Sequence, residues 1–432
     1  MDVLARGSGL QLKRPLPSSG VASMNLSSEE EAMLEGEAGT VAKIAIEHQI
    51  KVGDFFGAHD FVSVTQAHIM ADTESLGQAG VMWLEKLADA GDGRVRIPTI
   101  TDPRGTDFEN ADILGHADWM LELERRAITA LQRLGVTMTD TCINYQTVQA
   151  ATRGEHVAFG DTGVVIYSNS VCGARSNFEG GPSALAAGLT GRVPRYGYHL
   201  DAIRQASIRL RLHWTPRELS EWGALGGVVG RLTGNYWQVP VIEGLDRFPG
   251  SDELKHFGAA MASFGSTPLF HLVGITPEAY SLAAVGGDKL SIAHHIGEAE
   301  VRALSESYGV GTAVDVVVFS APQLSLFELR DLAALSLGRH FKRPLLAVTS
   351  PQVKPDCDRL GYTATIEAAG GNVLSGNCFY QSYAREMSET KGWKRLATNS
   401  AKLVNILGGY GYLPMLASMR ACVDAAESGE LK

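Results

Sequence analysis

The stretch Val314-Asp315-Val316-Val317-Val318-Phe319 decides the fold class of this chain. Its four consecutive apolar residues, 316–319, are typical of a β-strand that is covered on both faces, as in a parallel sheet. Three further segments have the same strand character, namely residues 61–64, 164–167 and 345–348. We therefore expect an α/β protein with largely parallel sheets.

Helical patterns separate these strands. Ser27 and Glu30 have the spacing of a capping box and predict the start of a first helix. Apolar residues at intervals of three and four predict seven more helices: residues 76–90, 114–134, 216–225, 253–263, 298–307, 324–337 and 355–369. This alternation predicts several α/β/α units.

Length and composition set the domain count. A chain of 432 residues suffices for two or three domains. Residues 1–23 mix basic residues with proline and serine, and we expect a loose extension there. The chain contains 48 glycines, which indicates many tight turns and close backbone contacts. The glycine-rich residues 223–230 and 407–411 are either ordinary turns or a rim where a partner docks.

Charge and hydropathy exclude several function classes. The chain has 38 basic and 48 acidic residues, a net charge of −10, without a basic stripe that could follow a phosphate backbone. Nucleic acid and anionic membranes are therefore poor partners. The longest uncharged stretch, 257–277, predicts a helix, a turn and a buried strand rather than a membrane span. The first 23 residues lack the apolar core of a secretory signal, so we expect a cytoplasmic protein.

The five cysteines are too few and too widely spaced for a disulfide framework or a CxxC metal motif. Any metal site must therefore be assembled from distant segments. Phosphate-loop, HExxH and GxSxG motifs are also absent from the sequence.

Three polar loops follow apolar runs, at residues 168–183, 375–379 and 398–402. In parallel sheets such loops are where sites gather. In the first loop, Arg175 has a planar fork that suits a carboxylate or a phosphate, or it forms an internal salt bridge. In the third loop, Thr398 or Ser400 either caps a helix or binds a ligand.

Several of these segments resemble the aconitase X family. The matching motifs are Gly154-Glu155-His156, the run from Ser168 to Asn177, residues 179–185, residues 274–279, Ala321-Pro322-Gln323-Leu324-Ser325 and Thr398-Asn399-Ser400-Ala401-Lys402. The resemblance covers residues 24–432. It implies the catalytic large part of a hydro-lyase, aconitase-like, with two or three α/β units around a central cleft. It also implies a separate small subunit.

The resemblance implies one of two activities. One is the dehydration of cis-3-hydroxy-L-proline to Δ1-pyrroline-2-carboxylate, and the alternative is the dehydration of mevalonate 5-phosphate. The net negative charge, and the lack of a lysine or arginine cluster near Arg175 in the sequence, favour the first. A hypothesis from a different class is a non-catalytic small-molecule-binding scaffold.

The family binds iron through cysteines of its large part. The resemblance therefore implies three ligands, Cys142, Cys172 and Cys378. They would hold an iron–sulfur cluster, with [2Fe–2S] favoured, or a single iron ion. The alternative for Cys172 is a small buried apolar residue. Cys357 and Cys422 are expected to be structural.

The same resemblance implies a substrate pocket, in which Arg175 or Lys402 pairs with the substrate carboxylate. Its expected residues are Asn169, Ser170, Arg175, Ser176, Asn399, Ser400 and Lys402. In this family the base is a serine of the small part. The group that protonates the departing hydroxide is expected among His59, Asp60 and His68, and a buried structural role is the alternative for these histidines.

Overall fold

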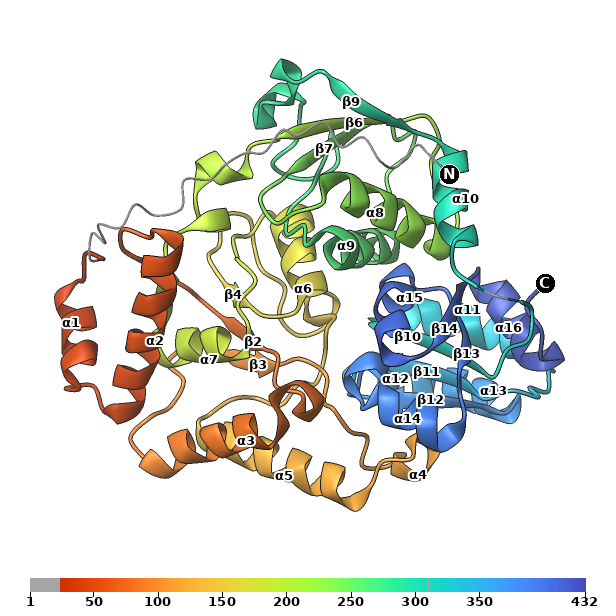
Figure 1. The fold of residues 1–432 in the computed structure, drawn as a ribbon, viewed down its shortest axis with the longest axis horizontal. Coiled ribbons are helices and arrows are strands. Elements are labelled where there is room, and N and C mark those ends of the chain that lie inside the picture. The colour runs from red at the N-terminus through yellow and green to blue at the C-terminus, as the bar shows by residue number, and fades with distance from the viewer. Residues whose placement is uncertain (1–23, 310) are drawn as a thin grey trace.

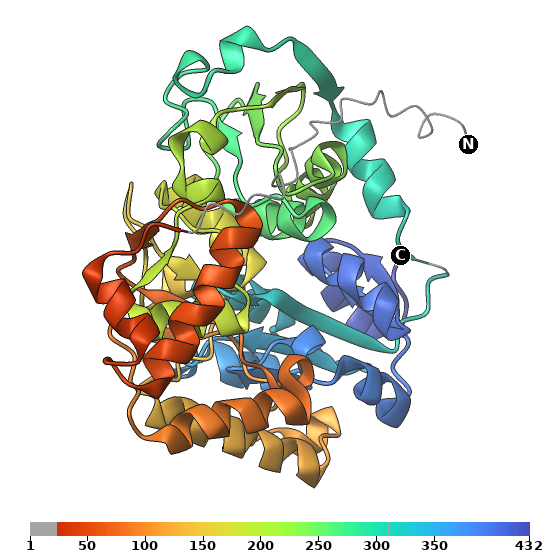
Figure 2. The same ribbon diagram turned by 60° about the vertical axis from the view of Figure 1, so that its left-hand side comes forward.

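The computed structural model describes residues 24–309 and 311–432. Within them, three α/β units follow one another along the chain, each built on its own parallel sheet (Figure 1). In the turned view of Figure 2, the green second unit lies above the blue third unit, the red helices of the first unit stand to the left, and its orange helices lie at the bottom. The prediction of largely parallel sheets is confirmed, since the one antiparallel pair among the described strands joins β1 (Phe61–Ser63) to β5 (Arg192–Pro194).

The first unit has a three-stranded sheet in the order β3-β2-β4. Its strands are β2 (Ala67–Ile69), β3 (Thr99–Thr101) and β4 (Ala158–Phe159). Its helices are α1 (Ser28–Glu35), α2 (Thr40–Phe56), α3 (Thr73–Ala90), α4 (Ala111–Leu114), α5 (Asp118–Arg133), α6 (Thr162–Tyr167) and α7 (Gly181–Thr190). The predicted capping box of the first helix is confirmed, because Ser27 and Glu30 each bond the backbone N–H of the other.

The second unit has four parallel strands in the order β8-β7-β6-β9. They are β6 (Ile208–Leu212), β7 (Pro240–Glu243), β8 (His271–Leu272) and β9 (Ile292–Ile296), and its helices are α8 (Leu219–Thr233), α9 (Ser251–Gly265) and α10 (Glu298–Glu306). Helices α8 and α9 touch through glycine. A Cβ on Gly226 would lie 2.1 Å from the Phe257 carbonyl oxygen, and one on Gly265 would lie 2.2 Å from that of Gly230. The expectation that residues 223–230 form turns or a docking rim is therefore wrong, since they lie inside a packed helix.

The third unit has five parallel strands in the order β12-β11-β10-β13-β14. They are β10 (Val316–Leu324), β11 (Leu345–Thr349), β12 (Gly371–Ser375), β13 (Arg395–Thr398) and β14 (Leu413–Leu416). Its helices are α11 (Leu326–Ser336), α12 (Lys354–Arg359), α13 (Tyr362–Ala368), α14 (Ala384–Lys391), α15 (Ala401–Leu407) and α16 (Met419–Ser428). Every residue of the central strand β10 is buried, which confirms that residues 316–319 form a strand covered on both faces.

Three predicted elements need correction. Residues 164–167 are not a strand but part of α6, because the Asp161 side chain accepts a hydrogen bond from the Val164 N–H and starts a helix there. The predicted helix 114–134 begins only at Asp118, after Gly115 has adopted a left-handed conformation. Gly361 breaks the predicted helix 355–369 into α12 and α13 in the same way.

The uncharged stretch 257–277 contains the end of α9 and then β8, as expected. Across the described residues, every helix is too short or too polar to cross a membrane. The expected extension, residues 1–23, lies outside the described residues.

Candidate active site where the three units meet

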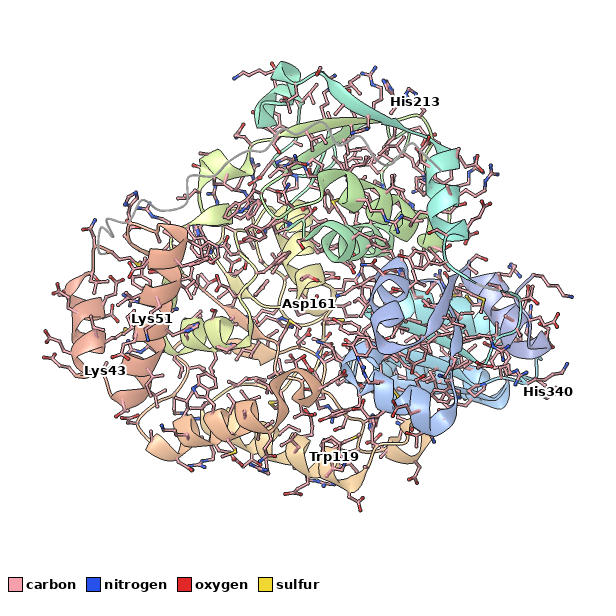
Figure 3. The ribbon with its side chains drawn as sticks, in the orientation of Figure 1. Lys43, Lys51, Trp119, Asp161, His213 and His340 are labelled. Carbon is pink, nitrogen blue, oxygen red and sulfur yellow. The ribbon has the colours of Figure 1, made fainter. Side chains whose placement is uncertain are left out.

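Loops from the first and third units meet in a buried polar cluster near the middle of the molecule, where Figure 3 labels Asp161. We call this set the junction cluster; its members are Asp102, Cys142, Asp161, Cys378 and Lys402. Each of the five is at most 5% exposed. Asp102 follows β3, Asp161 caps α6, and Lys402 lies in the first turn of α15. The ends of parallel strands thus converge here, as the fold class predicts.

The charge balance of the junction cluster depends on one ion pair. The Lys402 Nζ lies 3.1 Å from the Asp161 Oδ2, and both side chains are buried. Burial by itself lowers the pKa of Lys402, but Asp161, Cys142 and Cys378 together outweigh this effect and raise it. Burial would likewise raise the pKa of Asp161, but Lys402, the Val164 N–H and His68 together lower it. Both groups are therefore charged at neutral pH.

Asp102 and His68 lie beside this ion pair, and burial favours the neutral form of both. Burial raises the pKa of Asp102 well above its usual value, and the negative charge of Asp161 raises it further. Burial lowers the pKa of His68, so its ring is neutral. The His68 Nε2 lies 2.8 Å from the Thr141 carbonyl oxygen, to which it donates, and 3.5 Å from the Asp102 Oδ1. The protonated form of Asp102 is therefore favoured by its burial and by Asp161.

Cys142 and Cys378 bring two thiols into the junction cluster. Burial raises the pKa of Cys142 well above its usual value, and the charge of Cys378 adds to this effect. Burial also raises the pKa of Cys378, to about 12, although Lys402 opposes the shift. Without a further cation both thiols stay protonated. A metal ion is the kind of ligand that would deprotonate them together.

Among the described residues, Cys172, the third expected ligand, forms no metal-holding group with Cys142 and Cys378. It ends the short helical turn η2 (Ser168–Cys172) and is partly exposed, and burial followed by the charge of Glu155 raises its pKa to about 11. Over residues 24–309 and 311–432, no three histidine, cysteine, aspartate or glutamate side chains are grouped so that they could hold a metal ion. The structure thus brings two of the three expected ligands together.

Three expected substrate residues are engaged in bracing their own loop. The Asn169 side chain donates to the Ser176 and Pro268 carbonyl oxygens and accepts from the Ser176 N–H, each at 2.9 Å. The Ser170 hydroxyl accepts from the Phe270 N–H. All of these groups are buried. Their contacts explain why the loop holds its shape.

In the third loop, Asn399 and Ser400 are also buried. The Ser400 hydroxyl accepts from the Leu403 N–H, which caps α15, and donates to the Ala321 carbonyl oxygen at 2.6 Å. The cap alternative for Ser400 is therefore correct. By starting α15 here, the cap directs Lys402 toward Asp161.

Arg175 lies away from the junction cluster and pairs with exposed Asp201, while also donating to the His199 carbonyl oxygen. This is the internal salt bridge that the sequence analysis gave as the alternative role of Arg175. Three arginines lower the pKa of the His156 ring, in addition to the larger effect of burial. They are Arg175, Arg195 and Arg204. The sequence has no basic cluster near Arg175, but folding brings arginines that are distant in the sequence to the same histidine.

His59 and Asp60 do not lie with His68. His59 is exposed, and Asp60 forms a two-pronged ion pair with Arg195. Of these three expected acid groups, His68 alone borders the junction cluster.

Sequence reasoning missed Asp102, Asp161 and Gln381. The Gln381 amide bonds the carboxyls of Asp102 and Asp72, at 3.2 and 3.4 Å. A single aspartate after a strand carries no spacing signal. The available hint was the position of Asp161 three residues before Val164, where an aspartate commonly caps a helix.

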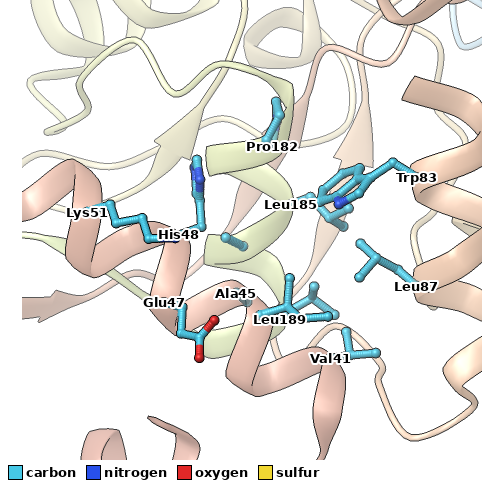
Figure 4. Close-up of a pocket in the computed structure, with 12 residues that line it drawn as sticks. Val41, Ala45, Glu47, His48, Lys51, Trp83, Leu87, Pro182, Leu185 and Leu189 are labelled. Carbon is cyan, nitrogen blue, oxygen red and sulfur yellow. The ribbon is translucent and has the colours of Figure 1, made fainter. Parts of the chain in front are cut away.

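A separate cavity of about 220 Å³ lies between α2, α3 and α7 (Figure 4). Its wall is mostly apolar and includes Trp83, Leu185 and Leu189, with Lys51 and His48 among its polar residues. The His48 ring bonds the Ser183 hydroxyl at 2.9 Å. No cysteine lines this cavity, and Glu47 and Lys51, which both do, form no ion pair among the described residues, so we take the junction cluster as the candidate site.

Comparison with known proteins identifies three family models in sequence order. They are the aconitase X first domain, residues 23–202, the second domain, residues 206–306, and the third domain, residues 314–428. The solved structure of Thermococcus kodakaraensis aconitase X (holo-form) matches with a TM-score of 0.84 and 29% identity, over 93% of this chain and 100% of that chain.

Two groups of relatives are similar at nearly equal identity. The phosphomevalonate dehydratase large subunit of Methanothermobacter thermautotrophicus is 33% identical over 94% of this chain and 98% of its own length. The cis-3-hydroxy-L-proline dehydratase of Pseudomonas aeruginosa is 32% identical over 94% of this chain and 71% of its own length. Both names describe hydro-lyases, which supports an enzyme rather than a non-catalytic scaffold. Because these matches run almost from end to end, and because the fold agrees with them, the chain belongs to the aconitase X family of dehydratases.

Proposed function

We propose that this chain is the large subunit of an iron-dependent dehydratase that converts cis-3-hydroxy-L-proline to Δ1-pyrroline-2-carboxylate. The observation that carries the proposal is the junction cluster, in which two buried thiols lie beside one buried ion pair and one protonated carboxyl. Such a set suits the removal of hydroxide from a small hydroxy acid, because it combines metal ligands, a cation and a proton donor.

Cys142 and Cys378 fit an iron site, since both thiols are buried in one polar cluster and need a cation to ionise. Cys172 would have to move to join them, and a [2Fe–2S] cluster with three cysteine ligands depends on that movement. When bound, iron would supply a Lewis acid toward the substrate hydroxyl.

The side chains around the thiols would bind the substrate and handle its proton. Lys402, rather than Arg175, would attract the substrate carboxylate, because Lys402 lies beside the two thiols, where Asp161 is its partner, whereas Arg175 pairs with Asp201 outside the junction cluster. Asp102 would protonate the departing hydroxide, because burial and the negative charge of Asp161 favour its protonated form. Asn169, Ser170, Ser176, Asn399 and Ser400 would then act by holding the two loops.

The base would come from a small subunit. In cis-3-hydroxy-L-proline the hydroxyl is trans to the α-hydrogen, so anti elimination needs a base on the face opposite the leaving group. Several relatives carry the words large subunit in their names, which supports a small partner. General base catalysis contributes about 10²- to 10⁴-fold, so this chain alone would be nearly inactive.

A second candidate is the dehydration of mevalonate 5-phosphate. The observation that favours it is the arginine group around His156, which offers the positive charge that a phosphate requires. Each of these arginines already has an acidic partner, namely Asp201, Asp60 or Glu278. Lys402, the cation of the first candidate, also has an acidic partner in Asp161, but it lies beside the two thiols, whereas these arginines surround His156.

The test is an assay of both substrates with the chain purified anaerobically, alone and together with a co-expressed small subunit. We expect iron in the purified protein, turnover of cis-3-hydroxy-L-proline only with the small subunit, and slower turnover of mevalonate 5-phosphate. Turnover of neither substrate would refute the proposal. Preference for the phosphate would establish the second candidate, and full activity of the chain alone would show that the base lies within it.

A further inference from the structure

Gln323 lies where all three units meet. It is fully buried near the end of β10, directly after Ala321 and Pro322. Its side-chain Nε2 donates to the Asp140 carbonyl oxygen at 3.1 Å and to the Asn377 carbonyl oxygen at 3.2 Å. Its Oε1 accepts from the Cys142 N–H at 3.3 Å. One amide therefore bonds the loops of both thiols.

The backbone of Gln323 adds two contacts. Its N–H donates to the Cys142 sulfur at 3.4 Å, and its carbonyl oxygen accepts from the Lys255 Nζ at 3.2 Å. Lys255 belongs to α9 of the second unit and is itself held by Glu328. The residue is thus anchored on the second unit while it holds the Cys142 loop of the first and the Cys378 loop of the third.

These contacts have a direct consequence for the thiols. Cys142 and Cys378 are 236 residues apart in the chain and belong to different units, so the spacing of their sulfur atoms depends on how the two loops are joined. A buried amide with both N–H groups used resists displacement, because an unpaired N–H would be costly there. A backbone N–H directed at sulfur also favours the thiolate form.

We propose that Gln323 is a positioning residue that fixes the spacing of the Cys142 and Cys378 sulfur atoms before a metal ion binds. The inference rests on the proposed function only in taking these two thiols as metal ligands. It assigns no contact with substrate to Gln323. Partners that orient metal ligands typically change metal affinity by about 10- to 100-fold when they are lost.

The test uses cadmium, whose bonds to thiolates give an ultraviolet charge-transfer band that grows with the number of thiolates bound. The full chain is stripped of metal and titrated with Cd²⁺ in a background where Cys172, Cys357 and Cys422 are alanine. The variants are Gln323→Leu and Gln323→Glu, which keep roughly the side-chain size but lose the donors. Cys378→Ser gives the signal of a single thiolate.

Gln352→Leu is the matched control. Its amide also crosses to the first unit, where it donates to the Thr139 carbonyl oxygen at 2.9 Å in the same loop as Cys142, but no described hydrogen bond joins it to Cys142 itself or to the Cys378 loop. We expect the parent and the Gln352→Leu variant to bind Cd²⁺ through two thiolates with similar affinity. Both Gln323 variants should bind about 10- to 100-fold more weakly or show the single-thiolate band.

Each other outcome is decisive. Parent-like affinity and a two-thiolate band in both Gln323 variants would overturn the positioning role and leave the proposed function intact. Failure of the parent itself to bind Cd²⁺ through two thiolates would overturn both proposals. Loss of the folded state in both Gln323 variants, measured by circular dichroism, would make Gln323 a folding residue and would also refute the positioning role.

Discussion

Two polar loops that look alike in the sequence behave differently in the structure. In the loop 168–177, which we call the braced loop, the polar side chains bond one another and the backbone of the second unit, and the ion-pair partner of Arg175 is exposed Asp201. In the loop 398–402, Ser400 caps a helix and Lys402 pairs with the buried carboxylate of Asp161 in another unit. Polar composition therefore does not distinguish the braced loop from one that contributes to a site. The difference lies in the charged side chain, whose partner is exposed in the first loop and buried in the second.

The largest expected effect separates Cys142 and Cys378 of the junction cluster from Cys172 of the loop 168–177. Cys142→Ser or Cys378→Ser should abolish iron binding, because each removes a ligand from the junction cluster. Cys172→Ser should retain most of the iron, because Cys172 lies in the braced loop. The measurement is iron per chain after anaerobic purification. Full iron in either of the first two variants would break the comparison, and loss of iron in the third would show that Cys172 joins them.

The next effect compares the two ion pairs. Lys402→Met should lower the free energy of unfolding by about 3–5 kcal/mol, because it leaves the buried Asp161 charge unpaired. Arg175→Met should cost no more than about 1 kcal/mol, because Asp201 is 84% exposed. Urea unfolding measures both. In the double variant Lys402→Met/Asp161→Leu much of the stability should return, and equal effects of the two single changes would contradict the comparison.

A third prediction concerns pH. Burial raises the pKa of Glu124 to about 7, although its bond to Thr73 opposes this shift. The folded chain therefore keeps a proton between about pH 5 and 7 that the unfolded chain has released, and stability falls as the pH rises through this window. In the Glu124→Gln variant, the decrease in the free energy of unfolding across this window should be smaller by up to about 3 kcal/mol.

The control for this prediction is Glu122→Gln, because Glu122 lies on the same helix α5 with its side chain 66% exposed. Urea unfolding at several pH values should give parallel curves for this control and the parent. A Glu124→Gln variant that follows them as well would show that Glu124 is already ionised in the folded chain.

The smallest predicted effect on activity is that of Asn169 in the loop 168–177. Asn169→Ala should cost about 1–3 kcal/mol of stability, since it leaves the buried Ser176 N–H and Pro268 carbonyl oxygen unpaired. The KM of the protein assembled with its small subunit should change less than threefold. A large rise in KM with unchanged stability would instead make Asn169 a substrate ligand.

The sequence predicted part of this arrangement, for physical reasons that differ between elements. Residues 316–319 were predicted correctly because four consecutive apolar residues are typical of a strand that is covered on both faces. Residues 164–167 are equally apolar but form a helix. The prediction failed there because periodicity cannot distinguish a short buried helix from a buried strand. The deciding residue, Asp161, lies outside the run.

For the site, the motifs identified Cys142, Cys378 and Lys402, all of which lie in the junction cluster. The same reasoning could not find Asp102, because its role comes from burial and from proximity to Asp161, 59 residues away in the sequence. It also could not tell that Arg175 would meet Asp201, since either residue could equally have faced solvent. Distances across units arise only when the three sheets are assembled.

The glycine contact between α8 and α9 affects how related sequences should be read. Gly226, Gly230 and Gly265 leave no room for a side chain, so substitution there forces the two backbones apart. A survey of tolerated substitutions would therefore find an invariant stripe in the second unit, away from the thiols. Such invariance would record how closely two helices approach, and ranking residues by invariance alone would send mutagenesis to the wrong part of the enzyme.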